Sequence, residues 1–424
     1  MRSRLPRLLT LSLLFAISIF MGCASSFQPR SLEEINFQER SQTQADGSIR
    51  ITAAVLSADE TKAIFGFGLY KKGIQPIWLE IENKDDSPAW FLPFSVDPDY
   101  FPPLEVTYPY HRTFDSEYND QIDRYFLDHA MGMRLAPGSV RSGFVFTNLD
   151  LGTKSFNVDL VGEDNQPHTF TFFIPVPGLR LDHYKVDWET LYTEDELQDV
   201  DVPGLIDGLE ALPCCVQDKK GKSYGDPLNI AIVGDLQDAY YAFMRAGWDE
   251  TETIYGTSLL KTLKSAISGS QYRYSPVSAL YVYGRSQDVS LQKARSSINK
   301  RNHLRLWLTP MRFEGKPVWI GQISRDIGVR FTWKTITTHK IDPDVDEARE
   351  YLLEDLAYAQ SIAAFGYVRG VGAAPFNAPR GNLTGDPYFT DGLRLVLFVS
   401  AEAADISEIR FMNFGEHPTL FDPE

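Results

Sequence analysis

Apolar residues alternate with polar ones through much of the chain between residues 50 and 178. They occupy every second position in runs at 77–81, 144–146, 156–160 and 170–174. A period of two is typical of half-buried β-strands, and the polar segment 162–166 between the last two runs predicts a hairpin loop. Short strands joined by glycine- and proline-rich turns predict a β-sandwich of immunoglobulin-like (Ig-like) architecture, without the Cys…Trp…Cys pattern of true immunoglobulin domains.

One stretch within this region has the spacing of a helix instead. Ile122, Tyr125, Phe126 and His129 fall at positions i, i+3, i+4 and i+7, which places them on one side of an α-helix. We therefore expect one inserted helix, with His129 packed at the edge of its apolar stripe rather than acting as a ligand.

The pattern changes to mixed helices and strands from about residue 224. Strands are predicted at 229–233, 279–283, 303–308, 317–324, 329–333 and 393–399. Asp235 is a suitable N-cap for a helix that closes at Gly247, a second helix is expected at 258–267, and Asp342 followed by Pro343 predicts a helix that runs to about Ala364. A glycine- and proline-rich loop at 366–392 is either a binding loop or a variable surface connection. The predicted fold class is α+β and multidomain, an N-terminal Ig-like β-sandwich followed by a mixed α/β domain.

The first 23 residues predict export. Arg2, Arg4 and Arg7 precede an apolar run at 8–21, which is short for a membrane span of about 20 residues but suits a secretory signal. The run closes at Phe20-Met21-Gly22-Cys23, which resembles a bacterial lipobox and predicts acylation of Cys23. The alternative is a plain signal peptide whose cysteine is incidental. We expect a lipid-anchored protein of the cell envelope, on the outer membrane or the cell membrane, facing the periplasm or the exterior.

These patterns divide the chain into six segments. They are a lipoprotein signal peptide at 1–22, a tether at 23–49, the β-sandwich at 50–178, a connector at 179–223, the α/β domain at 224–400 and a C-terminal tail at 401–424. Removal of 1–22 takes away three of the 41 basic residues, so that the net charge changes from −16 to −19. Non-specific nucleic-acid binding depends on basic surface, so we expect no nucleic-acid partner.

Two further cysteines, Cys214 and Cys215, are adjacent. In an oxidising compartment they could form a vicinal disulfide, bridge to another chain, or remain buried thiols. They make a poor zinc site, because further ligands at metal spacing are missing.

The segment 301–308 carries the most distinctive chemistry. As a strand it places Arg301, His303, Arg305 and Trp307 on one face, opposite the leucines between them. Two guanidiniums, an imidazole and an indole on one ribbon suit an anionic or aromatic group, and Arg285, at the end of another strand, could add a cation. The alternative is a solvated sheet face or a row of structural ion pairs.

The candidate acid/base or metal-ligating residues are His303, His339, Asp342 and Asp391. Imidazoles and carboxylates hold zinc or move protons, although histidines also serve widely in structural hydrogen bonds. The chain lacks the HExxH, P-loop and GxSxG motifs, and a proline interrupts the opening of a Ca²⁺ loop at 342–346. The sequence therefore specifies neither a metal nor a cofactor.

Six motifs, taken in order, resemble the LssY C-terminal domain over about residues 224–400. They are Asp226-Pro227-Leu228-Asn229, Ala246-Gly247-Trp248, Leu280-Tyr281-Val282-Tyr283-Gly284-Arg285, Arg301-Asn302-His303-Leu304-Arg305-Leu306-Trp307, Thr338-His339-Lys340-Ile341-Asp342 and Tyr388-Phe389-Thr390-Asp391-Gly392. In that family the domain also occurs behind membrane segments of DedA and lipid-phosphatase type. The resemblance therefore implies an envelope setting near lipid-linked or phosphorylated molecules, and it supplies no catalytic residue.

We therefore expect a membrane-anchored cell-envelope lipoprotein that acts as a binding or assembly module, with an anion-binding face in its C-terminal domain. Its partners would be the membrane, through the anchor, and envelope proteins or an anionic ligand. One alternative is a hydrolase that acts on a phosphorylated or lipid-linked envelope substrate, for which His303 and His339 must converge. Another is an accessory component of a secretion system.

Overall fold

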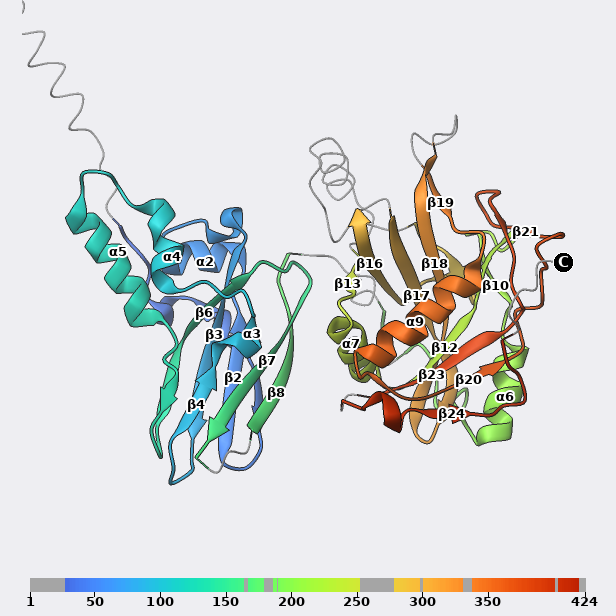
Figure 1. Ribbon diagram of the computed structural model, residues 1–424, viewed down its shortest axis with the longest axis horizontal. Coiled ribbons are helices and arrows are strands. Elements are labelled where there is room, and N and C mark those ends of the chain that lie inside the picture. The colour runs from blue at the N-terminus through green and yellow to red at the C-terminus, as the bar shows by residue number, and fades with distance from the viewer. Residues whose placement is uncertain are drawn as a thin grey trace, which may run out of the picture. The chain divides into compact units, whose positions relative to one another are not determined.

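The computed structural model describes residues 27–163, 167–178, 186–188, 190–251, 278–297, 300–330, 338–400 and 403–418. The predicted signal peptide, Cys23 and the helix expected at 258–267 lie outside these ranges. The chain forms two compact units (Figure 1): Met1–Asp150 with Phe156–Val176 make unit 1, and Leu151–Ser155 with Pro177–Glu424 make unit 2. Within the described residues, no helix has the length and apolar character needed to cross a membrane.

Unit 1 contains two four-stranded sheets that share a core. One sheet has the order β1 (Gln42–Ala45), β2 (Ile49–Val55), β3 (Ile74–Asn83), β6 (Val140–Asn148); the other has the order β5 (Arg134–Leu135), β4 (Ala89–Leu92), β7 (Thr153–Gly162), β8 (Pro167–Pro175). Ile51 and Leu79 of the first sheet pack in one buried cluster with Phe91 and Phe172 of the second. The period-two pattern thus gives the sandwich-like pair of sheets, because each strand turns its apolar residues inward.

Helices cover the other face of the first sheet. They are α2 (Ala58–Phe65), α4 (Pro103–Thr107) and α5 (Ser116–His129), with 3₁₀ turns η1 (Leu32–Glu34), η2 (Asn36–Arg40), η3 (Leu69–Lys72) and η4 (Tyr108–Tyr110). The short helix α3 (Pro93–Val96) follows β4 and places Val96 in the core between the two sheets. Phe65 of α2 and Phe126 of α5 share a second core with Trp78 of β3 and Phe146 of β6. The helix predicted from residues 122–129 is therefore confirmed as α5.

Residues 27–49, which we expected to form a tether, pack on unit 1 from Phe27 onward. Phe37 is fully buried in the second core, and residues 42–45 form β1, an edge strand that pairs with β2. The segment lacks periodicity, but single buried aromatic residues and main-chain pairing are enough to order it.

The main element of unit 2 is a ten-stranded mixed sheet. Its strands lie in the order β13 (Asp249–Glu250), β16 (Val289–Ser297), β17 (Lys300–Phe313), β18 (Lys316–Arg330), β12 (Ile230–Val233), β23 (Arg394–Val399), β20 (Ile362–Val368), β24 (Arg410–Met412), with β19 (Thr338–Ile341) beside β18 and β9 (Gln198–Val200) beside β17. β12 is parallel to β23 and antiparallel to β18. β24 falls within the segment expected to be a C-terminal tail and pairs with β20.

Helices pack on both faces of this sheet (Figure 1). Ile230 and Ile232 of β12 join a core with α7 (Leu236–Arg245) and α9 (Val345–Tyr358). Ala231 and Val233, which point the other way, pack with Leu205 of α6 (Val202–Ala211). A small sheet with the order β11 (Tyr224–Pro227), β10 (Cys215–Gln217), β14 (Tyr281–Val282), β15 (Arg285–Ser286), the hairpin β21 (Arg380–Gly381)–β22 (Pro387–Tyr388) and the turn η6 (Ile406–Glu408) complete the unit.

Several predicted boundaries in unit 2 are wrong. The strands expected at 317–324 and from 329 onward belong to one strand, β18. The helix expected to reach Ala364 ends at Tyr358, because Gln360 adopts a left-handed conformation (φ 56°) and Ile362 begins β20. Its N-cap is Asp344, whose side chain accepts hydrogen bonds from two main-chain N–H groups, and not Asp342.

The loop expected at 366–392 begins three residues later, since Gly366 is part of β20. A Cβ atom at Gly366 would lie 2.6 Å from the carbonyl oxygen of Met412 in β24. The glycine is therefore required by the close approach of β24, and does not mark the end of a strand.

Candidate functional site

The face of β16, β17 and β18 that points away from α7 and α9 is lined by polar side chains. Leu304 and Leu306 of β17 pack in the core beneath the two helices, so the residues between them point to the opposite face. Register places Ser290 and Gln322 beside Arg305, and Gln292 and Ser324 beside His303. We call this set the polar ribbon: Ser290, Gln292, Arg301, His303, Arg305, Gln322, Ser324 and Asp326.

Every member of the polar ribbon is buried, with at most 8% of its surface exposed. Arg301 Nη1 donates a hydrogen bond to Gln292 Oε1 (2.7 Å), and Arg301 Nε lies 3.7 Å from Asp326 Oδ2. Arg305 Nη1 donates to Gln322 Oε1 (2.9 Å) and Arg305 Nη2 donates to the carbonyl oxygen of Ser278 (3.2 Å). A neutral carboxamide thus orients each guanidinium without cancelling its charge, whereas the Asp326 carboxylate offsets part of the charge of Arg301.

His303 forms a buried pair with Asp326. Its Nε2 lies 2.7 Å from Asp326 Oδ2. Burial lowers the pKa of His303 to about 4, because the attraction of Asp326 does not offset desolvation and the repulsion by Arg301 and Arg305. The imidazole is therefore neutral at pH 7, and it is a weaker proton acceptor than an ordinary histidine.

Arg301 Nε and Gln322 Nε2, two donor atoms of the polar ribbon, are buried and without a hydrogen-bond partner among the described residues. Arg301 Nε faces Asp326 Oδ2 at 3.7 Å, beyond hydrogen-bond distance. Buried donors are normally paired, and leaving one unpaired costs about 1–3 kcal/mol. The amide nitrogen of Gln322 is an N–H donor, so its missing partner is an acceptor.

Trp307 and Arg285, which we expected to join the anion-binding face, are used elsewhere. Trp307 is fully buried in a cluster with Val216 and Val282 of the small sheet. Arg285 donates to both carboxylate oxygens of Asp288 (3.0 Å each) and to the carbonyl oxygen of Leu308 (2.7 Å). These contacts join the small sheet to β17, because Trp307 Nε1 of β17 donates a hydrogen bond to the carbonyl oxygen of Arg285 in β15 (3.4 Å).

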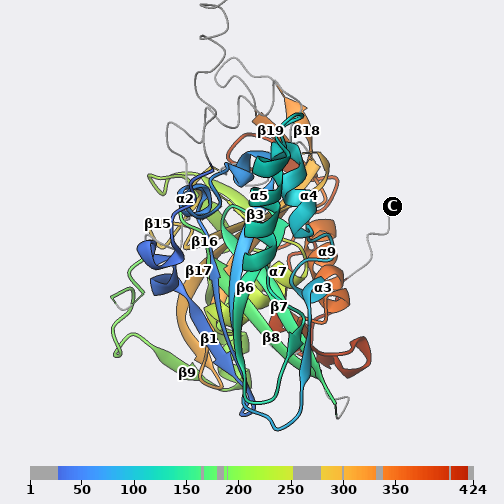
Figure 2. The same ribbon diagram turned by 90° about the vertical axis from the view of Figure 1, so that its left-hand side faces the viewer.

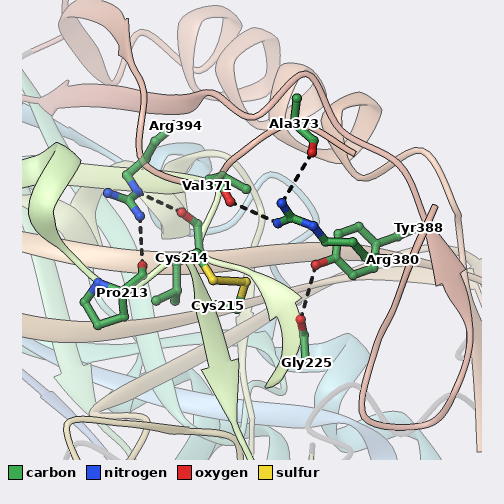
Figure 3. Close-up of a disulfide and its surroundings, with 10 residues drawn as sticks. Pro213, Cys214, Cys215, Gly225, Val371, Ala373, Arg380, Tyr388 and Arg394 are labelled. Atoms are coloured by element: carbon green, nitrogen blue, oxygen red, sulfur yellow. Dashed lines mark hydrogen bonds between the residues drawn. A yellow bond between two sulfur atoms is a disulfide. The ribbon is translucent and has the colours of Figure 1, made fainter. Parts of the chain in front are cut away.

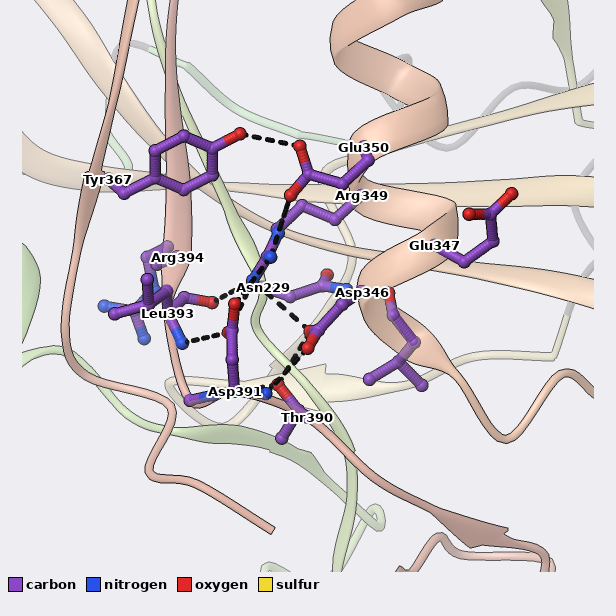
Figure 4. A network of polar contacts seen from close by, with 12 residues as sticks. Asn229, Asp346, Glu347, Arg349, Glu350, Tyr367, Thr390, Asp391, Leu393 and Arg394 are labelled. Atoms are coloured by element: carbon purple, nitrogen blue, oxygen red, sulfur yellow. Dashed lines mark hydrogen bonds and ion pairs between the residues drawn. The ribbon is translucent and has the colours of Figure 1, made fainter. Parts of the chain in front are cut away.

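Asp391 belongs to a second buried network, centred on Arg349 (Figure 4). Arg349 Nη1 and Nη2 donate to the two oxygens of Asp391 (2.9 Å each), Nη1 lies 3.3 Å from Asp346 Oδ1, and Nη2 lies 2.8 Å from Glu350 Oε1. Burial raises the pKa of Asp346 to about 6, with Arg349 opposing the rise and Asp391 adding to it. Asp391 is thus tied to α9 and not to His303.

The other two acid/base candidates do not meet His303 either. His339 is described by its backbone, which pairs with Val329, whereas His303 pairs with Ser324 five residues earlier on β18. At about 3.3 Å per residue this separates the two positions by roughly 16 Å along the strand. Asp342 Oδ1 accepts a hydrogen bond from the N–H of Asp344 in the turn before α9.

Cys214 and Cys215 form a vicinal disulfide at the start of β10 (Figure 3). Arg394, which is fully buried, donates to the carbonyl oxygens of Pro213 (2.9 Å), Leu228 (2.8 Å) and Leu209. The guanidinium therefore holds together three chain segments around the disulfide. Across the described residues, no group of three or more His, Cys, Asp and Glu side chains is placed to hold a metal.

Sequence reasoning missed the residues that complete these sites. Gln292, Gln322 and Asp326 become members of the polar ribbon only through strand register, and no local signal marks them. Arg349 could have been found, because Asp346 and Arg349 have the i, i+3 spacing of an ion pair on a helix.

The segment that contains the polar ribbon is similar to a known protein family. Residues 209–393 match the family model of the LssY C-terminus. No curated protein matches the chain. The chain thus carries an LssY-like C-terminal domain, which includes the polar ribbon, the vicinal disulfide and the Arg349 network.

Proposed function

We propose that the protein is a lipid-anchored envelope protein whose C-terminal domain binds an anionic ligand through the polar ribbon. The observation that carries the proposal is the pairing of two buried guanidiniums with carboxamides. A carboxamide does not neutralise a guanidinium, and the forked N–H groups of Arg305 match the oxygens of a phosphate or carboxylate. Asp326 offsets part of the charge of Arg301.

An unpaired donor supports an oxygen-rich ligand. Gln322 Nε2 has no hydrogen-bond partner among the described residues, and register places Gln322 directly beside Arg305. An anion that accepts from Gln322 Nε2 therefore also places its charge next to the Arg305 guanidinium. In a buried site such hydrogen bonds are stronger than in water.

Binding is favoured over catalysis by the state of His303. A pKa of about 4 leaves little tendency to accept a proton at pH 7, and Asp391 is held by Arg349. The geometry therefore supports the binding module rather than the hydrolase that acts on a phosphorylated substrate.

The ligand site is tested with the full-length protein in detergent, by following thermal unfolding while inorganic phosphate or a simple carboxylate is added. A ligand at one hundred times its Kd stabilises the folded state by about 2.7 kcal/mol, so we expect a rise in Tm. Gln322→Met should weaken this rise while leaving the fold intact. Arg312→Gln is the matched control on the neighbouring strand β17, since Arg312 pairs with the exposed Asp199 and should behave like wild type. Equal Tm shifts in Q322M and wild type would exclude the polar ribbon as the site.

The anchor is tested separately. Cys23→Ser should abolish acylation and move the protein from the membrane fraction to the soluble fraction, because acyl chains contribute about 0.8 kcal/mol per buried CH₂ group. Unchanged fractionation of C23S would exclude the lipid anchor and leave the ligand site untouched.

A further inference from the structure

One end of unit 1 gathers aromatic side chains around the first described residue. Phe27 is 8% exposed, and its ring packs against Phe67 (5.6 Å between centroids) and Tyr125 of α5 (5.2 Å). Phe67 in turn stacks on Tyr110 at 4.2 Å. The place where the chain enters unit 1 is therefore fixed beside α5 and η4.

Large apolar side chains are exposed next to this entry point. Tyr108 and Phe114 flank Tyr110 in the segment that joins α4 to α5, and they are 74% and 98% exposed. In both views the N-terminal part of α5 lies at the same end of the unit as α2, away from the turns at the far ends of β3 and β4 (Figures 1 and 2). A single exposed aromatic residue needs no explanation, but Tyr108 and Phe114 lie within one short segment and are both largely exposed.

Positive charge accompanies these aromatic residues. Lys62, Lys71 and Lys72 are exposed and line a hollow with Tyr110 and one acid, Asp59. The acids Glu117, Asp120 and Asp128 lie instead along the flank of α5, where they line the hollow that holds Phe27. The entry point thus has a lysine-lined hollow on the side of α2 and η3 and a mainly acidic hollow on the side of α5.

The short length of chain between Cys23 and Phe27 limits how far this end of unit 1 can lie from Cys23. Cys23 is four residues before Phe27, and four residues span at most about 14 Å. If Cys23 is acylated and its chains lie in a bilayer, the entry point is held within this distance of the lipid surface. Aromatic residues at the headgroup level and lysines next to anionic lipid are both favourable there.

We propose that this end of unit 1, with Tyr108, Phe114, Lys62, Lys71 and Lys72, rests on the surface of the lipid bilayer. The inference depends on the lipid anchor at Cys23 put forward under Proposed function. It goes beyond anchoring, because it fixes which end of unit 1 faces the membrane and gives the aromatic segment a role as a lipid contact.

Depth-dependent quenching tests the contact. The full-length acylated protein carrying Phe114→Trp is reconstituted into vesicles of phosphatidylethanolamine and phosphatidylglycerol that contain lipids with brominated acyl chains. Bromine quenches tryptophan that enters the bilayer, so we expect F114W to lose more fluorescence than the parent protein, whose native tryptophans provide the baseline. Phe114 is almost fully exposed, so this substitution should not disturb folding.

Val140→Trp is the matched control. Val140 is 59% exposed and pairs with Glu82, eight residues along β3 from Ile74, which follows η3. That places it roughly 26 Å from the proposed contact, and V140W should show no added quenching. Combining F114W with Lys62→Gln, Lys71→Gln and Lys72→Gln should reduce its quenching.

The outcomes separate the contact from the anchor. Acylation is read by the mass of the N-terminal peptide and by flotation of the protein with vesicles. An acylated, floating protein in which F114W and V140W are quenched equally overturns the proposed contact and leaves the anchor standing. A protein that is not acylated refutes the anchor, and the contact falls with it.

Discussion

Arg349 gives the sharpest test of how unit 2 is held together. Its side chain is 1% exposed, and it is the cation shared by Asp391 and Asp346, whose side chains are 4% and 9% exposed. Arg349→Met keeps much of the volume but removes the charge, leaving two carboxylates buried side by side. Breaking a buried pair in this way costs about 3–5 kcal/mol, so we expect a loss of unfolding free energy of this size at pH 8.

The loss should shrink as the pH falls. Burial already raises the pKa of Asp346 to about 6, and removal of Arg349 takes away the charge that opposes this rise. A carboxyl group with a raised pKa stabilises the folded state below its unfolded pKa, and that stability is lost as the pH rises through the folded value. Each unit of pKa corresponds to about 1.4 kcal/mol, so R349M should recover by about 1 kcal/mol or more at pH 5.

Denaturant titration of R349M and wild type at both pH values measures the effect. Arg312→Met is the control, because the Arg312–Asp199 pair (3.0 Å) is partly exposed and such pairs contribute about 0–1 kcal/mol. A cost for R349M below 1 kcal/mol at pH 8, or the same cost at pH 5 and pH 8, would show that the network does not carry this stability.

Two further changes probe unit 2. Gly321→Ala should cost about 1–3 kcal/mol through overpacking, because a Cβ atom there would lie 2.7 Å from both Ile230 and Leu306; a thermal shift no larger than experimental error would contradict this. Burial raises the pKa of Glu250 to about 7, although hydrogen bonds from Thr153 oppose the rise. Wild type therefore loses stability as the pH rises through 7. Glu250→Gln removes this ionisation, and its Tm relative to wild type should therefore be higher at pH 8 than at pH 5; a constant difference would refute the reasoning.

Elements with strong local signals could be predicted from the sequence. α5 follows from an apolar stripe. α7 begins after Asp235 and closes near Gly247, where the sequence predicts, although the Asp235 side chain makes no capping hydrogen bond to the described residues. β18 was divided in two because Ser324, Arg325 and Asp326 are polar and Gly328 follows shortly after. In the fold Arg325 and Asp326 are buried by partners that are distant in the sequence, among them Asn302 and His303, so the strand continues through them.

The limits of the candidate site have a similar cause. Alternation along β17 correctly separates Arg301, His303 and Arg305 from the leucines, because this period is local. Trp307 shares their face but lies under the small sheet, whose position depends on long-range packing. Gln292 and Gln322 orient the guanidiniums through strand register, and a one-residue slip of either strand would turn them to the other face.

The position of β23 in the large sheet has a consequence for the way the domain folds. β23 lies between β12 and β20, so about 165 residues separate the two halves of the β12–β23 pairing. Contacts between residues so far apart in sequence form late, because the chain must first lose the entropy of a long loop. The segment that matches the family model stops at residue 393, one residue before β23 begins. A polypeptide that ends there has β12 and β20 but not the strand that joins them, so the sheet can close only after the residues beyond the matched segment have been synthesised and, in an exported protein, have crossed the membrane.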